Sequence, residues 1–486
     1  MEDMRRAWII ALGFELGLGS WSPSLASSLA VYAPPPVPQI YAWHNDDFTV
    51  RVRVPGGEWR DLYEYRIRVD WDRPQDASLV YFDFTGTVEI EIQKNNGAFG
   101  GVSVAPLAAK LKPDRNGAVV RLRLDKPQSF SLQFDDDRLH NLHILAGAPP
   151  PPRPSGPNVI YFGPGVHVPP DKAPVFPVKS GDTIYLDGGA ILRGGFTLDG
   201  LHDVTILGRG LIYNPGQAIE INRAQDIHIN DLILTNDETQ PAARVANIRE
   251  SSNVSLVGVS GFTAGKWSDG INISTARHIR VDRSYLRTSD DAIVVYAVAD
   301  CPICKTKPEP PRSRALDTQD IKITNSVLWT DVAHAMYVGH FGDNTTPRTI
   351  ADVTFDNIDV ANLDEDDPAW EGAMAIFSGD ATRIRDITFS NIRVDRIEEG
   401  KLINIVAGVS PRYNIAPGRG VENVTLRDIA FTGEGLASTS QIRGESNAAA
   451  IRGVLIENVT IGGRRLKPED MTGLTIGPFV SGLTIR

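Results

Sequence analysis

The chain has 486 residues, of which 42% are hydrophobic and 22% charged, and its formal net charge is −11. This length accommodates two domains, or one domain and a long solenoid. The negative net charge argues against nucleic acid and anionic membrane surfaces as partners, and it mildly disfavours a polyanionic substrate.

An export signal is expected over residues 1–30. Two arginines precede a mostly apolar run from Ala7 to Gly19, and small residues allow cleavage after Ala26 or Ala30. An amphipathic first helix is the alternative, because Glu15 interrupts the apolar run. No other segment reaches the ~18 apolar residues that cross a bilayer, so we expect a secreted protein, extracellular or periplasmic, that does not enter the membrane.

Residues 31–148 are predicted to form an N-terminal β-sandwich. Apolar and polar residues alternate over segments such as 48–54, 65–69 and 88–92. This period of two is typical of half-buried antiparallel strands, and several such strands indicate a sandwich. The proline-rich segment 149–158 offers few ladder donors, and it is therefore predicted to be a linker between two domains.

A repeat predicts a right-handed parallel β-helix over residues 159–486, so the fold class is all-β. Nine segments open on apolar–polar–apolar triplets, and they begin at Val204, Ile227, Val254, Ile279, Ile321, Val353, Ile387, Val424 and Val454. The fifth residue of the unit is Asn, Asp or Gly in eight of the nine copies, which are the residues that tolerate a left-handed backbone at a tight corner. Intervals of 23 to 42 residues fit coils that carry loops of different length.

Three aspartates in this ladder are candidate catalytic residues. Asp269 and Asp290 are 21 residues apart, close to one coil, and should lie on adjacent coils at similar positions. Asp291 follows directly, and in a regular strand it would point to the opposite face, so both reach one cleft only where the strand bends or ends. Paired carboxylates facing one groove can protonate a leaving oxygen and activate water. Taken singly, each aspartate could instead only cap backbone amides.

The blocks Ser268-Asp269-Gly270, Ser289-Asp290-Asp291-Ala292-Ile293 and His334-Ala335-Met336-Tyr337-Val338-Gly339 resemble the active-site blocks of glycoside hydrolase family 28. That family contains the polygalacturonases, and its blocks read Asn-Thr-Asp, Asp-Asp and Gly-His-Gly. The resemblance implies that Asp290 is the general acid, while Asp269 and Asp291 hold and deprotonate the attacking water. His334 would support the protonation state of the acid by hydrogen bonding. Hydrolysis would invert the anomeric centre, with carboxyl groups ~6.5–9.5 Å apart.

The chain departs from family 28 where that family binds the galacturonate carboxylate. The Arg-Ile-Lys block of the family corresponds here to Met374-Ala375-Ile376, which leaves no cation unless Arg383 or Lys401 substitutes. Glycoside hydrolase family 49, the dextranases and isopullulanases, is similar in placing a β-sandwich before the β-helix, and its substrates are neutral α-glucans. We therefore expect a hydrolase of a neutral polysaccharide, resembling a dextranase.

Three alternatives to this expectation remain. A polygalacturonase-like pectin hydrolase is the first, and a non-catalytic carbohydrate-binding β-helix is the second. A polysaccharide lyase or epimerase on the same fold is the third, but it typically needs calcium with an Arg or Lys base. The sequence leaves open the sugar, the linkage, and endo or exo action. The sandwich could bind substrate or cover the exposed edge of the first coil.

Aromatic side chains along the groove are candidate substrate-binding residues, because sugar rings stack on aromatic faces. Trp267 and Tyr296 flank the aspartates, and Tyr337 and Trp370 follow further along the chain. His340 could be a second polar residue of the groove. Ordinary packing is the alternative for each aromatic residue.

The remaining chemistry-bearing residues predict no cofactor and no metal. Cys301 and Cys304 are the two cysteines of the chain, and we expect either a local disulfide or two free thiols. The acidic run 364–367 is expected to be a solvated loop rather than a calcium site. The protein is expected to be a monomer whose partner is a polysaccharide or oligosaccharide.

Overall fold

The computed structural model describes residues 27–215, 218–237, 242–298, 316–365, 367, 372–410, 412–434 and 438–486. The expected leader up to residue 26, both cysteines and Trp370 lie outside these residues. Helical structure in the described part of the chain consists of α1 (Gln39–Ala42) and two 3-10 turns, Leu107–Ala109 and Pro170–Lys172. No helix there is long and apolar enough to cross a membrane. The all-β prediction is confirmed.

Residues 28–147 form two sheets packed face to face. One sheet contains β1 (Ser28–Ala30), β4 (Tyr65–Val69), β5 (Gln75–Thr85), β7 (Val102–Ala105), β10 (Gln128–Phe134) and β11 (Asp137–Gly147). The other contains β2 (Phe48–Arg53), β3 (Arg60–Asp61), β6 (Val88–Lys94), β8 (Asp114–Asn116) and β9 (Val119–Leu124). Buried and exposed residues alternate along β2, because one face of the strand meets the opposite sheet and the other meets solvent. A core that includes Val52, Phe82, Ile90 and Ile144 fills the space between the sheets.

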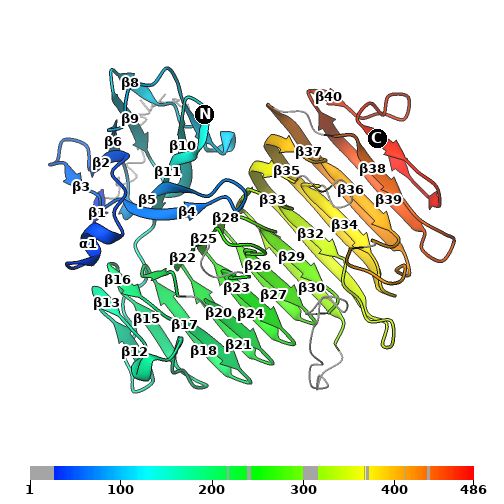
Figure 1. Ribbon diagram of the computed structural model, residues 1–486, viewed down its shortest axis with the longest axis horizontal. Coiled ribbons are helices and arrows are strands. Elements are labelled where there is room, and N and C mark those ends of the chain that lie inside the picture. The colour runs from blue at the N-terminus through cyan, green and yellow to red at the C-terminus, as the bar shows by residue number, and fades with distance from the viewer. Residues whose placement is uncertain are drawn as a thin grey trace, which may run out of the picture.

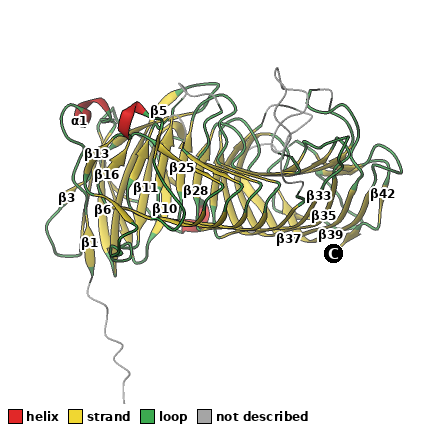
Figure 2. Ribbon diagram, turned by 90° about the horizontal axis from the view of Figure 1, so that it is seen from below, coloured by secondary structure: helices red, strands yellow, loops and turns green. Residues whose placement is uncertain are grey.

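A right-handed parallel β-helix follows the linker, and its first strand begins at Val159. Figure 1 shows its coils as a stack that runs from β12 to the C-terminal strands. The stack continues along the length of the molecule (Figure 2).

Its larger sheet has 21 strands: β12 (Val159–Phe162), β13 (Gly165–His167), β15 (Thr183–Leu186), β16 (Ala190–Leu192), β18 (His202–Gly208), β19 (Leu211–Tyr213), β21 (Gln225–Asn230), β22 (Ile233–Asn236), β24 (Ser252–Val257), β25 (Ser260–Thr263), β27 (Arg277–Asp282), β28 (Tyr285–Thr288), β30 (Thr318–Thr324), β31 (Val327–Thr330), β33 (Thr349–Asp364), β35 (Arg383–Glu399), β37 (Val421–Glu434), β39 (Ile451–Ile461), β40 (Arg464–Arg465), β42 (Val480–Ser481) and β43 (Thr484–Ile485). The eleven-stranded sheet contains β14 (Val175–Phe176), β17 (Gly195–Asp199), β20 (Ile219–Asn222), β23 (Ala246–Arg249), β26 (Ile271–Ser274), β29 (Ile293–Tyr296), β32 (Met336–Gly339), β34 (Met374–Ser378), β36 (Ile403–Ala407), β38 (Ser440–Arg443) and β41 (Leu474–Ile476).

The nine repeat positions predicted from the sequence lie in register. Each of the residues from Val204 to Val454 that opens a repeat pairs with its counterpart in the next copy. The fifth residue has a positive φ in all nine copies, including Arg283 at 53°. The corner therefore demands a left-handed backbone even where the residue is neither Gly, Asn nor Asp. Apolar side chains of successive coils stack into one continuous core, as Phe355 does on Phe389 with ring centroids 5.2 Å apart.

The sandwich packs along the side of the β-helix rather than over the edge of its first coil. One shared apolar cluster contains Trp43, Tyr65, Ile67, Val69, Ala77, Leu79, Tyr81 and Leu145 from the sandwich and Ile191, Leu211, Tyr213, Ile233, Phe262 and Tyr285 from the β-helix. These β-helix residues come from five successive coils, β16 to β28. The sandwich therefore braces the coils from outside.

A buried ion pair lies at the same interface. The guanidinium of Arg287 donates two hydrogen bonds of 3.0 Å to the carboxylate of Asp331, and neither side chain is more than 1% exposed. Arg287 also donates to Asn141 Oδ1 of the sandwich at 2.8 Å, and the backbone N–H of Asp70 donates to Asp331 Oδ2 at 3.2 Å. Such a pair is stable only while each charge keeps its partners.

Replacing Arg287 with methionine should destabilise the protein by about 3–5 kcal/mol, because the carboxylate of Asp331 is left buried without its cation. Guanidinium unfolding measures the loss. The matched control is Arg280→Met, which removes a half-exposed ion pair with Asp320 and should cost less than about 1 kcal/mol. Equal losses in the two variants would contradict the buried-pair explanation.

Candidate functional site

Parallel register gathers the chemistry-bearing residues at one edge of the eleven-stranded sheet. Strands β23, β26, β29 and β32 are neighbours there and pair from their first residues without a register shift. Two residues before the first residue of each strand stand Arg244, Asp269, Asp291 and His334. Neighbouring strands lie about 4.8 Å apart. Positions separated by 22 to 43 residues in the sequence therefore become neighbours in space.

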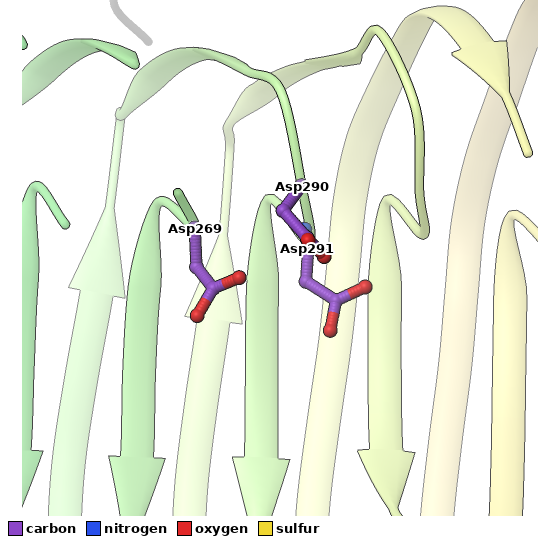
Figure 3. A group of neighbouring side chains, drawn as sticks. All are labelled: Asp269, Asp290 and Asp291. Carbon is purple, nitrogen blue, oxygen red and sulfur yellow. The ribbon is translucent and has the colours of Figure 1, made fainter. Parts of the chain in front are cut away.

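Asp290 joins this column because the chain bends before β29. The N–H of Asp291 donates to Asp290 Oδ1 at 2.9 Å, and the hydroxyl of Thr288 donates to the Asp290 carbonyl at 2.6 Å. This local bonding turns two sequential side chains towards one side, which a regular strand does not allow. Figure 3 shows the carboxylates of Asp269, Asp290 and Asp291 grouped above the strands. One oxygen from each lies within 4.8 Å of the others.

Three carboxylates lie close together at a site that is largely buried, which disfavours their charged forms. Asp269 and Asp291 are buried and Asp290 is half-buried. Burial raises the pKa of Asp290 well above its ordinary value, and the charges of Asp269 and Asp291 raise it further. Burial also raises the pKa of Asp269 to about 6, against the nearby Arg244 guanidinium, which lowers it. A carboxyl that keeps its proton towards neutral pH, such as Asp290, can act as an acid.

Arg244 is a site residue that the sequence alone did not reveal. Its Nε lies 3.1 Å from Asp269 Oδ2, and the amide of Asn272 donates to the same oxygen at 2.7 Å. Arg244 therefore offsets part of the negative charge and fixes the Asp269 side chain. The sequence signal for Arg244 is its position two residues before the start of a strand. This position can be recognised only when the register of the strands is known.

His334, which was expected to support the acid by hydrogen bonding, contacts Asp291. Its Nδ1 lies 2.8 Å from Asp291 Oδ1, and its backbone N–H donates to the same oxygen at 3.2 Å. The reason is the register, because His334 and Asp291 occupy the same position on adjacent coils while Asp290 lies one residue earlier in the bend.

Glu365 is a second site residue that was missed. It belongs to the acidic run 364–367, which was expected to be solvated, yet it is 4% exposed. Its Oε2 lies 3.4 Å from His334 Nδ1. The expectation of a solvated loop is wrong at this residue, because β33 continues to Asp364 and carries Glu365 back against the coil of His334.

The predicted sugar-binding aromatics differ in their exposure. Trp267, two residues before Asp269, is 55% exposed, and Lys266 Nζ lies 4.5 Å from the centroid of its ring. Tyr337 is 1% exposed and stacks on the His334 ring with centroids 4.2 Å apart, so it supports the histidine and offers no face to solvent. Tyr296 is also buried, and its hydroxyl lies 3.5 Å from Asp291 Oδ2.

His340 is buried next to these tyrosines. Its Nδ1 lies 2.5 Å from the Tyr337 hydroxyl, and its ring packs against Phe341 and Tyr413. Burial lowers the pKa of His340 well below its ordinary value. His340 therefore belongs to the wall under the site.

The coil after His334 presents apolar residues where family 28 has its Arg-Ile-Lys block. Met374 and Ile376 point into the core of the β-helix. Ala375 and Phe377 lie on the outer face, in an apolar cluster with Tyr296 and Tyr337. Arg383 does not substitute, because it lies in β35 of the larger sheet and donates to Glu422 at 2.6 Å.

Among the described residues, the group of acids close enough to share a metal ion is the same aspartate triad. Arg244 already supplies positive charge beside it at 3.1 Å. The three carboxylates therefore fit proton transfer, because the pKa values of Asp290 and Asp269 are raised and a guanidinium group accompanies Asp269.

Comparisons with known proteins agree with this architecture. The family model described as glycosyl hydrolases family 28 matches residues 189–474. Among solved structures, the chain is similar to Dex49A from Penicillium minioluteum at 13% identity and a TM-score of 0.54, covering 94% of this chain and 96% of that chain. It is also similar to a family 28 exopolygalacturonase from Yersinia enterocolitica at 12% identity and a TM-score of 0.50, covering 82% and 93%. These two likenesses concern the fold. No curated protein matches in sequence.

Asp290→Asn should make the folded state more stable at pH 8 than wild type by roughly 1–3 kcal/mol, with a smaller difference at pH 4. The folded state binds the Asp290 proton more tightly than the unfolded chain, because its pKa is raised. Wild-type stability is therefore lost as the pH rises from about 4 through the folded pKa, and asparagine has no proton to lose. Denaturant unfolding at both pH values measures the effect, with the exposed Asp125→Asn as control. A difference that does not depend on pH would contradict it.

Proposed function

The chain belongs to glycosyl hydrolases family 28, and from that membership we propose that it is a secreted enzyme that hydrolyses a neutral α-glucan with inversion. The observation that carries the hydrolytic part is the convergence of three carboxylates from adjacent coils, with oxygens within 4.8 Å.

In the proposed mechanism, Asp290 donates its proton to the glycosidic oxygen. Asp269 and Asp291 orient a water molecule and accept its proton as it attacks the anomeric carbon from the opposite face. The bond between this carbon and the glycosidic oxygen breaks in the same step, so the configuration inverts. Arg244 and Asn272 hold Asp269, and His334 holds Asp291, at the distances given above. Trp267 offers an aromatic face beside Asp269 for stacking on a sugar ring.

The charges around the site favour a neutral substrate. Arg244, Lys401 and Arg412 each face a carboxylate: Asp269 at 3.1 Å, Glu365, and Asp367 at 2.8 Å, respectively. A further cation, the exposed Lys266, lies over the Trp267 ring at 4.5 Å from its centroid. The acids of the site outnumber these cations. A uronate would add negative charge where the adjacent coil presents Ala375 and Phe377 rather than a cation, and desolvating an unpaired carboxylate is costly.

Pectin hydrolysis is the second candidate function. It is supported by the likeness to the Yersinia exopolygalacturonase and by membership of family 28. Arg244 would bind a uronate at the expense of its ion pair with Asp269, and the exposed Lys266, three residues before Asp269, is a second candidate cation.

Secretion is supported by the leader-like residues 1–30. The last of these form β1, whose Ser28, Leu29 and Ala30 pair with β5 of the sandwich. Cleavage after Ala26 keeps this strand in the folded protein and cleavage after Ala30 removes it, so we propose Ala26 as the site.

The substrate proposal is tested with purified protein on dextran, pullulan and polygalacturonan, by measuring reducing ends and product sizes. We expect reducing ends from a neutral α-glucan and none from polygalacturonan.

Asp290→Asn should lower kcat by about 10²–10⁴-fold with an unchanged circular dichroism spectrum, because it removes the acid. The matched control is Asp320→Asn, at an outer corner of the coil, which should keep wild-type activity. Release from polygalacturonan alone would contradict the neutral substrate, and an active Asp290→Asn would contradict the role of the acid.

Inversion needs a test of its own, because the carboxylates lie closer together than usual. Inverting enzymes typically separate their carboxyl groups by ~6.5–9.5 Å and retaining enzymes by ~5–5.5 Å. One oxygen from each carboxylate lies within 4.8 Å of the others, with Asp269 one coil away from Asp290 and Asp291. Proton NMR of the first product formed should show the β-anomer from an α-linked substrate. An α-anomer at early times would contradict a single displacement.

A further inference from the structure

Two carboxylates converge on one nitrogen of His334. Asp291 Oδ1 lies 2.8 Å from Nδ1, and Glu365 Oε2 lies 3.4 Å from the same atom. Carboxylates accept hydrogen bonds, so this nitrogen carries the hydrogen that both acids face. All three side chains are buried. Nothing in the aspartate motifs requires the second acid.

The geometry around this nitrogen is fixed from several sides. The imidazole ring stacks on Tyr337 with an angle of 15° between the planes, so the plane of the ring is set. Glu365 is held by its own backbone N–H, which donates to the Glu399 carbonyl at 3.2 Å, and its Oε1 accepts from the N–H of Asp367 at 3.0 Å. Glu365 therefore reaches His334 as a preformed partner.

We propose that Glu365 is a positioning residue for hydrolysis: it holds Nδ1 of His334 towards Asp291 and links the charge of the catalytic carboxylates to its own ionisation. The proposal rests on the proposed roles of Asp290 and Asp291. Glu365 touches no reacting atom and acts only through His334 and through its charge.

The ionisation of Glu365 falls in a range that matters for activity. Burial raises its pKa to about 7, while His334 lowers it. Below this pH Glu365 is neutral, and glutamine imitates that form. Above this pH the charged carboxylate of Glu365 raises the pKa of Asp290, so that Asp290 keeps its proton to a higher pH. The charged and titratable groups that face Glu365 are His334, Asp290, Asp291, Tyr337, Asp367 and Lys401.

The first experiment compares kcat/KM of wild type and Glu365→Gln from pH 4.5 to 8.5 on the polysaccharide that wild type hydrolyses. The two should agree below about pH 6, and wild type should exceed the variant about threefold or more at pH 8, which corresponds to a shift of about half a pH unit in the alkaline limb. KM should stay unchanged. A purely structural role would lower activity by one factor at every pH.

Asp364→Asn is the matched control. Asp364 is the neighbouring residue, and burial also raises its pKa to about 7. It faces the sandwich, however, and pairs with Arg73 at 3.0 Å. Its pH profile should superimpose on that of wild type.

The second experiment needs no substrate. In protein labelled at the glutamate carboxyl carbon with 13C, the signal lost in Glu365→Gln identifies Glu365, and it should titrate near pH 7. Replacing His334 with alanine should move this titration upward by about half a unit or more, because the partner that stabilises the charged form is gone.

A pH profile of Glu365→Gln that superimposes on that of wild type, or a Glu365 titration that ignores His334, would overturn the proposal. If no polysaccharide is hydrolysed, the proposed function fails, and the titration still decides whether Glu365 and His334 are coupled. If Asp290→Asn is inactive but the pH profiles of wild type and Glu365→Gln coincide, the proposed function stands and the proposed role of Glu365 fails.

Discussion

The site depends on parallel pairing in constant register. Because β23, β26, β29 and β32 align from their first residues, a side chain two positions before each strand meets the corresponding side chain of the next coil. Strand spacing then sets the distance between Arg244, Asp269, Asp291 and His334, whatever the length of the loops between them. A slip of one residue in any coil would turn its side chain to the other face and break the column.

Burial of the carboxylates raises their pKa values, which suits the site to proton transfer, but it also costs free energy of folding. Three carboxylates close together raise one another's affinity for protons, and the interior provides little water to offset their charge. Rigid surroundings keep them there. Below them lie the core of the β-helix and the tyrosines at 296 and 337, and along the side of the coils lies the sandwich with its Arg287–Asp331 pair. The fold therefore holds the carboxylates in an electrostatically unfavourable arrangement at the place where their raised pKa values can serve proton transfer.

Much of the fold was predictable because the repeat is local and periodic. The apolar triplets and the fifth residue of the unit gave the register correctly. The positive φ of Arg283 could not be predicted from its residue type, and the structure reveals it. The aspartates were predictable from their spacing of about one coil. Arg244 and Glu365 could not be predicted, because loops of unequal length separate them in the sequence from the residues that they contact in the folded chain. Tyr337 is packed, which was the alternative to sugar binding, and its apolar neighbours come from both adjacent coils. Arg287 and Asp331 are 44 residues apart and Arg287 and Asn141 are 146 residues apart, so this group of contacts leaves no local signal.

The most direct test of this arrangement is a crystal structure of Asp290→Asn with a bound oligosaccharide of the polymer that wild type cleaves. The amide of residue 290 should lie within about 3 Å of the glycosidic oxygen, with a water molecule held between Asp269 and Asp291 on the opposite side of the sugar ring. A sugar bound away from these three side chains, or a scissile bond facing another part of the coil, would contradict the central claim that the register and the bend before β29 assemble the hydrolytic site.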